Sequence, residues 1–266
     1  MAQTYQQRLK EYENAYNYKI IGRIPVIISI DGRSFSRVTR RLAKPFCDKF
    51  VSIMNHTMAN LAKQIDGVVF GYQYSDKIIL VLRNDQTNET DPWFGNNIQK
   101  IASVSAASAT YEFMNHLISM GDSAPELNGK IVFSANAFGL PGTTEVINYL
   151  TLRQLHCAHT AVNEAVYSVL SPKYGKDTAA FLEDKSVGER KDLIEEYGGD
   201  FDSLKQAYRY GSSVYSVPFL VETAQGQVNR NKWVVDFNIT AFSEDQSSLR
   251  TIIDTGSDVF RAERDL

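Results

Sequence analysis

Apolar residues along the first two thirds of the chain recur with two spacings, one typical of strands and one typical of helices. Short apolar runs rich in Val and Ile, bounded by turn residues, predict buried strands at 23–32 and 130–141. Residues 67–82 contain two such runs on either side of a polar centre. This pattern favours two antiparallel strands joined as a hairpin.

Helical spacing occurs between these strands. From Pro45 to Ile65 apolar residues recur every three or four positions, which predicts one amphipathic helix with Pro45 near its first turn. Long helices are expected over 93–120, where Ala and Ser are frequent, and over 145–170. A polar, exposed helix is expected over 4–18.

The order strand, helix, strand, strand, helix, strand is that of the ferredoxin-like or split βαβ fold. The sequence therefore predicts an α/β protein of the α+β type, with an antiparallel sheet backed by long helices. Farther along, short helices are expected around 186–198, and strands at 212–218 and 232–237. These form a C-terminal helical and β elaboration of the core.

The sequence contains no clear boundary between domains. It has no repeat, no low-complexity tract and no linker, and 43% of its 266 residues are hydrophobic, which is enough for a sizeable core. We expect a single domain over 1–266, with the core at 20–170 and the elaboration at 171–266.

Composition narrows the compartment and the partners. Cys47 and Cys157 are the only cysteines, too few for a disulfide framework and compatible with a reducing cytosol. The N-terminus is polar, and no apolar run approaches the roughly 18 residues of a membrane span, so we expect a cytoplasmic protein without a membrane partner. A net charge of −3 excludes a generally basic nucleic-acid-binding protein, so any such site must be a local patch.

The clearest candidate chemistry is a pair of aspartates. Asp31 ends the first strand and Asp76 lies in the hairpin, and the split βαβ topology brings these strands together. Adjacent carboxylates repel unless a cation lies between them, and one or two carboxylates suit Mg²⁺, with the carbonyl of Gly32 turned toward the same ion. The palm of many polymerases and nucleotide cyclases holds two metal ions in this way. The alternative is that Asp31-Gly32 and Ser75-Asp76 are ordinary turn pairs.

Two further groups of residues have both a chemical and a structural interpretation. Basic residues follow Asp31 closely: Arg33, Arg37, Arg40, Arg41, Lys44 and Lys49. They could be solvated, or they could bind a triphosphate and an RNA backbone. His156 and His159 are three residues apart on a predicted helix, but no third ligand matches them, which favours two polar helix residues over a zinc site.

Ordered blocks of the sequence resemble one known family. The segments IISIDGRSFSR (27–37), AKPF (43–46) and GYQYSDKIILVL (71–82) are similar to the tRNA-histidine guanylyltransferases and their relatives, the 3′-to-5′ RNA polymerases. The resemblance continues through 91–110, 133–163, 184–218 and 231–245, so it covers nearly the whole chain. It implies that the core is palm-like and catalytic.

The resemblance also implies an activity. Such an enzyme is a Mg²⁺-dependent nucleotidyltransferase, using two ions, that adds nucleotides from GTP, ATP or another NTP to the 5′ end of tRNA or another RNA, as in tRNA-His guanylylation or 5′-end repair. Family members often assemble as dimers or tetramers, so a homo-oligomer is expected.

Individual roles follow from the matched positions. Asp31 and Asp76 match the catalytic, metal-binding carboxylates, and the carbonyl of Gly32 matches a third metal ligand. Nucleotide contacts are implied for Asp31, Gly32, Arg33, Ser34, Phe35, Ser36, Lys44, Ser75 and Asp76. RNA contacts are expected from the basic cluster and from matched positions farther along the chain: Arg37, Arg40, Arg41, Arg153, Gln154 and Arg209.

The chain departs from the family where the family has Gln-Ser-Asp-Glu, because Lys77 replaces the Glu. Lys77 could pair with Asp76 or contact a phosphate, and strand alternation would place the two side chains on opposite faces, leaving the metal site intact. Ser134, Asn136 and His156 also replace charged family residues.

Three functions therefore remain. The first, which we favour, is nucleotide addition to RNA 5′ ends. The second is a palm-fold enzyme that makes a small nucleotide product without RNA, and the third is a non-catalytic RNA- or nucleotide-binding homologue.

Overall fold

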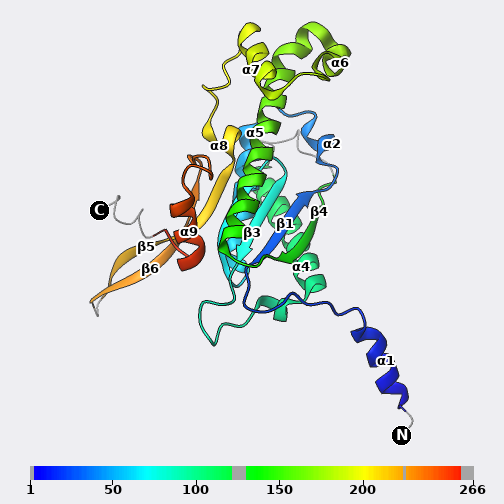
Figure 1. Ribbon diagram of the computed structural model, residues 1–266, viewed down its shortest axis with the longest axis vertical. Coiled ribbons are helices and arrows are strands. Elements are labelled where there is room, and N and C mark those ends of the chain that lie inside the picture. The colour runs from blue at the N-terminus through cyan, green and yellow to red at the C-terminus, as the bar shows by residue number, and fades with distance from the viewer. Residues whose placement is uncertain (1–2, 122–129, 224–225, 259–266) are drawn as a thin grey trace.

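In the computed structural model, helices cover both faces of one sheet (Figure 1). The structure describes residues 3–121, 130–223 and 226–258, and within these ranges six strands form the sheet. The strands are β1 (Val26–Gly32), β2 (Val68–Tyr74), β3 (Lys77–Leu82), β4 (Phe133–Gly139), β5 (Ser212–Thr223) and β6 (Gly226–Asp236). Their spatial order is β4-β1-β3-β2-β5-β6, and all neighbours are antiparallel.

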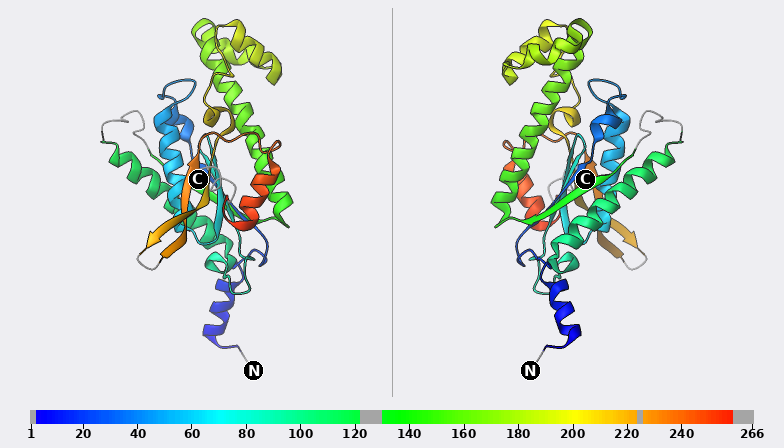
Figure 2. Two further views of the ribbon diagram at one scale, coloured as in Figure 1. Left: turned by 90° about the vertical axis from the view of Figure 1, so that its left-hand side faces the viewer. Right: turned by 90° about the vertical axis from the view of Figure 1, so that its right-hand side faces the viewer.

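The first four strands confirm the predicted fold class. The order β4-β1-β3-β2, with one helical connection between β1 and β2 and another between β3 and β4, is the split βαβ arrangement. β5 and β6 extend the sheet beyond β2 as a long hairpin that projects from the body (Figure 2).

Helices connect the strands and cover both faces of the sheet. Those around the sheet are α2 (Phe35–Thr39), α3 (Asp48–Gln64), α4 (Ile98–Ser119), α5 (Thr143–Tyr174) and α9 (Gln246–Thr255). The others are α1 (Tyr5–Asn14), α6 (Thr178–Leu182), α7 (Val187–Glu196), α8 (Gln206–Tyr210), and the 3₁₀ helices η1 (Trp93–Asn96) and η4 (Gly175–Asp177). α1 buries no residue, which confirms the exposed polar helix.

One face of the sheet is sealed by α3 and α4. Alternate residues of β1, among them Ile28 and Ile30, point toward these helices and are fully buried. They pack in one cluster with Met58 of α3 and Phe113 of α4. We call this the sealed face.

The opposite face is covered only in part, by α5 and α9. Ile27 and Tyr72 pack there with Leu150 of α5 and Ile253 of α9. Figure 1 shows that α5 crosses the sheet beside β3. It covers Ile27 of β1 but leaves Ser134 and Asn136 of β4 exposed. We call this side of the sheet the open face. Beyond the sheet, the second half of α5 packs instead against α6 and α7, the projecting end in Figure 1.

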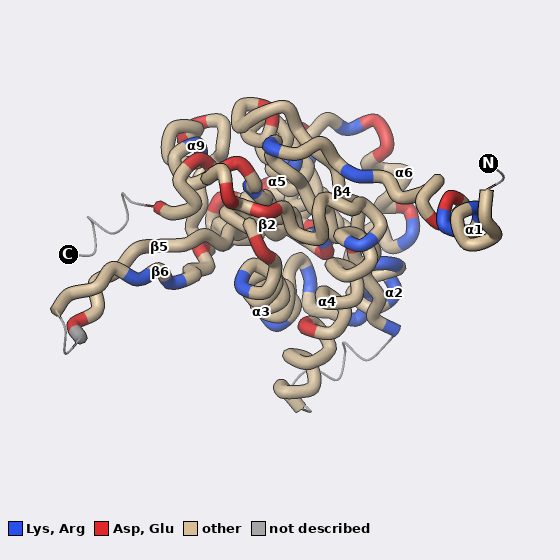
Figure 3. The backbone as a smooth tube through the Cα atoms, turned by 90° about the horizontal axis from the view of Figure 1, so that it is seen from below, with Lys and Arg blue, Asp and Glu red and all other residues tan. Residues whose placement is uncertain are grey.

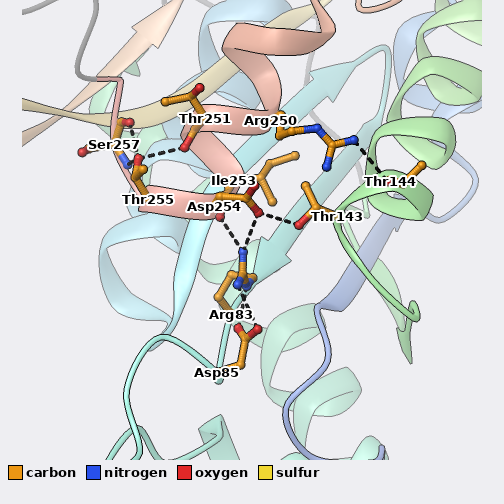
Figure 4. A network of polar contacts seen from close by, with 10 residues as sticks. All are labelled: Arg83, Asp85, Thr143, Thr144, Arg250, Thr251, Ile253, Asp254, Thr255 and Ser257. Carbon is orange, nitrogen blue, oxygen red and sulfur yellow. Dashed lines mark hydrogen bonds and ion pairs between the residues drawn. The ribbon is translucent and has the colours of Figure 1, made fainter.

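A polar network fastens α9 to the sheet (Figure 4). Arg83, just after β3, forms ion pairs with Asp85 at 2.6 Å and with Asp254 of α9 at 3.1 Å. The hydroxyl of Thr143, at the start of α5, donates to the same Asp254 carboxylate at 2.6 Å. The network lies at the Leu82 end of β3, so it braces the end of the sheet opposite to Lys77.

Two helix starts and one whole helix differ from the sequence-based prediction. The helix predicted from Pro45 begins at Asp48, because Pro45 and Phe46 lie before its N-cap residue, Cys47. The helix predicted from Trp93 begins at Ile98, where the side chain of Asn97 caps it by accepting a hydrogen bond from Lys100 N at 2.8 Å.

The third difference is α9, which was not predicted although Leu249, Ile252 and Ile253 have helical spacing and are buried. The two C-terminal strands are also longer than predicted and form one hairpin. No described helix is both long and apolar enough to cross a membrane.

Candidate functional site

The structure brings Asp31 and Asp76 together at one end of the sheet, as the topology predicts. β1 pairs with β3 so that Asp31 lies directly opposite Lys77, the residue after Asp76. The backbone N–H of Gly32 donates to the carbonyl of Asp76 at 3.0 Å. The two aspartates are therefore held by backbone pairing between neighbouring strands.

The turn that carries Asp76 is fixed by a buried amide. The side-chain nitrogen of Gln73 donates to the carbonyl of Ser75 at 2.8 Å, and its oxygen accepts from Asn55 and Ser212, each at 3.2 Å. Ser75 itself has a left-handed backbone (φ 50°), a conformation that costs energy for a residue other than glycine. No pattern in the sequence marks Gln73, Asn55 or Ser212 as supports of the site.

Electrostatics at the pair favour a bound cation. Burial raises the pKa of Asp76 above its usual range, the negative charge of Asp31 raises it further, and Lys77 opposes the shift. A positive charge between the two carboxylates would remove the repulsion. Oxygen donors of this kind suit Mg²⁺, so the residues present fit the ion that the sequence implies.

Lys77 makes a contact that the sequence did not predict. Its Nζ lies 2.5 Å from Oδ1 of Asp31, and the two side chains are 37% and 49% exposed. Lys77 thus pairs with Asp31 on the neighbouring strand, because residues directly opposite each other in an antiparallel pair project to the same face. Among the described residues, no group of three or more His, Cys, Asp or Glu side chains is placed to bind a metal.

The turn after β1 is built around Phe35. A Cβ atom on Gly32 would lie 2.5 Å from the Phe35 ring, so only glycine permits this packing. Phe35 is 2% exposed and packs against Phe133 with ring centroids 5.0 Å apart. The Phe35 side chain therefore belongs to the core and cannot contact a nucleotide directly.

The rest of this turn faces solvent beside the two aspartates. Ser34 is left-handed (φ 60°) and precedes α2, and Arg33, Ser34 and Ser36 are exposed. The basic residues Arg37, Arg40 and Arg41 are exposed as well, and Figure 3 shows Lys and Arg positions gathered around α2.

A small cavity lies between the N-terminus of α3, the Ser75 turn and α5. Its volume is about 110 Å³, and its lining includes Lys44, Cys47, Ser75, Thr160 and Tyr208. Lys44, which the sequence implicates, forms an ion pair at 2.8 Å with Glu164 of α5, also part of the lining. Apart from Lys44 and Ser75, the lining residues named here were not predicted from the sequence. They come from distant segments of the chain that only the fold brings together.

Arg153, Gln154 and Arg209, the predicted RNA contacts outside the basic cluster, have different surroundings. Gln154 is 5% exposed. Its side-chain nitrogen donates hydrogen bonds to the carbonyls of Tyr210 and Thr240, and its side-chain oxygen accepts one from the backbone N–H of Phe242. Gln154 therefore supports the buried structure and is not at the surface to contact RNA. Arg209 forms an ion pair with Asp202 at 3.0 Å.

Arg153 remains nearer to the surface of α5. Its guanidinium lies over the ring of Tyr149, 4.8 Å from the ring centroid, and the charge of Arg153 partly opposes the raised pKa of Tyr74 in β2. His156 approaches Arg153 at 3.5 Å, and no metal-binding group of three includes it or His159.

Ser134 and Asn136, the other two departures, line the open face beside the aspartates. On β4 they lie opposite Asp31 and Ser29 of β1, and both are exposed. The hydroxyl of Ser134 is 3.4 Å from the carbonyl of Asp31. The open face is thus polar and accessible at the end of β1 and β4 that carries Asp31 and Ser134.

Comparison with known proteins gives a consistent family. A sequence model described as tRNAHis guanylyltransferase matches residues 6–141. The chain is 26% identical over 219 residues to tRNA(His) guanylyltransferase 1 of Arabidopsis thaliana, covering 77% of this chain and 36% of the relative. It thus spans just over a third of the length of that protein. A probable tRNA(His) guanylyltransferase of Dictyostelium discoideum is 25% identical over 201 residues, which is 73% of this chain and 75% of the relative.

Solved structures agree with the fold over most of the chain. A bacterial tRNA(His) guanylyltransferase-like protein in complex with ATP superposes with a TM-score of 0.79 at 28% identity, covering 94% of this chain and 99% of the other. The corresponding complex with GTP gives a TM-score of 0.72 at 27% identity, covering 93% and 98%. The Saccharomyces cerevisiae enzyme, at 16% identity with a TM-score of 0.68 and coverage of 88% and 98%, shares the fold.

Proposed function

The chain belongs to the tRNAHis guanylyltransferase family, and from this membership we propose that it is a nucleotidyltransferase that adds nucleotides to the 5′ end of tRNA or another RNA. Growth in the 3′-to-5′ direction is part of the proposal. The similarity to a bacterial relative solved with ATP and with GTP supports these nucleotides as the substrates.

The observation that carries the proposal is the pair Asp31 and Asp76. They lie on adjacent strands, at the edge of an exposed polar surface, with the backbone of Gly32 between them. We propose Mg²⁺ as the cofactor, held by the two carboxylates and the carbonyl of Gly32. The ion would neutralise the phosphate charge and lower the pKa of the attacking hydroxyl.

The protein's own residues would bind and orient the nucleotide. The exposed turn at Arg33, Ser34 and Ser36 offers backbone N–H groups, hydroxyls and a guanidinium to a triphosphate. The cavity beside Ser75 is walled by the stacked rings of Phe46 and Tyr208, whose centroids are 4.3 Å apart. A purine entering this cavity would bring its phosphates toward the aspartates, with Lys44 at the rim.

RNA binding would use the basic segment. Arg37 lies in α2, Arg40 and Arg41 follow it, and all three are exposed. Lysine and arginine contacts to phosphate are the main source of affinity for RNA. We propose a further RNA contact for Arg153 of α5, which is partly exposed.

We also propose that the chain forms a homo-oligomer, a dimer or a tetramer. The projecting β5–β6 hairpin exposes apolar side chains, including Leu220 and Val228, which a second copy could cover. Light scattering at micromolar concentration should give a multiple of 29.9 kDa, and a monomeric mass would contradict this proposal.

A labelled-nucleotide assay tests the activity. The protein is mixed with Mg²⁺, one α-labelled NTP and tRNA lacking its 5′ nucleotide, carrying either a mono- or a triphosphate. We expect label on the RNA, and a loss of about 10³-fold or more in Asp31→Ala and Asp76→Ala, because each removes a metal ligand.

The matched control is Asp66→Ala, an exposed carboxylate that precedes β2 at the end remote from the site. It should keep full activity. If a labelled small nucleotide forms and the RNA carries no label, the protein is an enzyme that makes a small nucleotide product and does not extend RNA. Nucleotide binding without any turnover would reject the enzyme and leave a binding protein.

A further inference from the structure

The carboxylate of Asp31 already has a cationic partner within the chain. Lys77 Nζ lies 2.5 Å from Oδ1 of Asp31. A carboxylate that bridges two metal ions commonly gives one oxygen to each of them. With Oδ1 bound to the ammonium group, Oδ2 is the oxygen of Asp31 that an ion can reach without competing with Lys77.

The position of Lys77 is set by the backbone. It is the first residue of β3, paired with Asp31 of β1 on one side and with Tyr74 of β2 on the other. Its side chain therefore starts on the same face as Asp31, and its ammonium group contacts the carboxylate there. The ion pair is exposed and weak by itself, so Lys77 can exchange Asp31 for another anionic partner.

The local charge allows one divalent ion more readily than two. Asp31 and Asp76 bring two negative charges and Lys77 returns one positive charge. One divalent cation already makes the group net positive, which suits an incoming triphosphate. A second divalent cation would lie beside both the first ion and the ammonium group, with no further carboxylate to offset it, because the neighbours on β4 are Ser134 and Asn136.

We propose that this site holds one divalent cation per chain, and that the Lys77 ammonium group provides the positive charge that a second ion would otherwise supply. Lys77 then contacts the triphosphate or Asp31 according to whether substrate is bound. The inference rests on the proposed function, since the ion is the one that serves nucleotidyl transfer.

Counting bound ions tests the inference directly. Mn²⁺ replaces Mg²⁺, and free Mn²⁺ is measured by electron paramagnetic resonance, with and without one equivalent of a non-hydrolysable GTP analogue. We expect wild type to bind about one Mn²⁺ per chain in either condition, and Lys77→Glu to bind about two when the analogue is present, because it adds a carboxylate opposite Asp31.

Lys77→Met is the matched variant, because it removes the charge and keeps the length of the side chain. It should bind the first ion roughly two- to fivefold more tightly, since no ammonium group competes for Asp31. Thermal melts of all three proteins check folding, and the wild-type count is informative even if one variant does not fold.

The outcomes separate the two proposals. Two Mn²⁺ per chain in wild type would overturn the role of Lys77 and leave the proposed function standing. A single ion in folded Lys77→Glu would also overturn it, because something other than Lys77 would then limit the count. No Mn²⁺ bound in any of the three proteins would remove the metal site, and with it the proposed chemistry.

Discussion

The two faces of the sheet have opposite tasks, and β1 shows the contrast within one strand. Ile28 and Ile30 point into the sealed face, where α3 and α4 exclude water completely. Ser29 and Asp31, the residues that alternate with them, point to the open face and are partly exposed. The strand thus presents its packing and its chemistry on opposite sides.

The difference shows how a reactive surface can be held still. Two carboxylates and a lysine at the open face repel or attract one another, and such groups alone would not fix a geometry. Here the packing of the sealed face anchors the strands. Phe35 fixes the turn after Asp31, and Gln73 fixes the turn that carries Asp76. Functional groups placed on rigid elements keep their positions better than groups on free loops.

Substitution of neighbouring residues in β1 gives the largest expected effect. Ile28→Ala, in the sealed face, should lower the free energy of unfolding by about 2–5 kcal/mol, because it leaves a cavity in a closed core. Ser29→Ala, one residue away on the open face, should change it by less than about 0.5 kcal/mol. Urea denaturation of both variants measures this contrast, and equal losses would mean that the two faces are equally packed.

The two cysteines differ in burial and therefore in expected reactivity. Cys157 lies on the buried face of α5, where burial raises its pKa to about 12, whereas Cys47 is half-buried; both residues belong to the cavity lining. A raised thiol pKa means less thiolate at a given pH, so at pH 8 iodoacetamide should modify Cys157 at least about 100-fold more slowly than Cys47.

Mass spectrometry of timed samples gives the two rates. In 6 M urea the difference should vanish, because unfolding removes the burial of Cys157, and Cys157→Ala confirms which peptide reacts. Saturating GTP should slow the labelling of Cys47 if the cavity binds the nucleotide. Similar rates in the folded protein would show that the face of α5 that carries Cys157 is not packed against the sheet.

The sealed face is also the part of the fold that the sequence predicts best. Strands β1 to β4 and helices α3 and α4 could be predicted because both faces of each strand, or one stripe of each helix, must be apolar to be buried. The start of α3 was misplaced because Phe46 continues the apolar spacing before the helix begins. α9 was missed because it is short and its first three residues, Gln246–Ser248, are polar.

The open face was predictable only in part. Topology alone brings Asp31 and Asp76 together, so that proximity could be inferred. The contact of Lys77 with Asp31 depends on the register between β1 and β3, which are not consecutive in the chain. Hydrophobic alternation places a residue on a face but does not say which residue of another strand lies opposite. The cavity beside Ser75 likewise combines segments more than 80 residues apart.

The smallest expected effect on stability concerns the strain at the open face itself. Asp76→Asn should raise the free energy of unfolding at pH 7 without added metal, by up to about 1 kcal/mol, because it removes a buried negative charge and its repulsion from Asp31. The pKa of Asp76 is raised in the folded protein, so its charged form opposes folding once the pH exceeds that pKa. The gain should therefore be present at pH 7 and vanish near pH 3, where wild type is protonated as well.

Thermal melts across this pH range test the sign, with Asp66→Asn as a control that should show no gain. Saturating Mg²⁺ should reverse the order at pH 7, since an ion that binds only the folded wild type stabilises it and leaves Asp76→Asn unchanged. If Asp76→Asn instead lowers stability at pH 7 without metal, the attraction of Lys77 for Asp76 outweighs the repulsion from Asp31. The open face would then be a stabilised ion-pair network, and the contrast with the sealed face would lie in polarity alone.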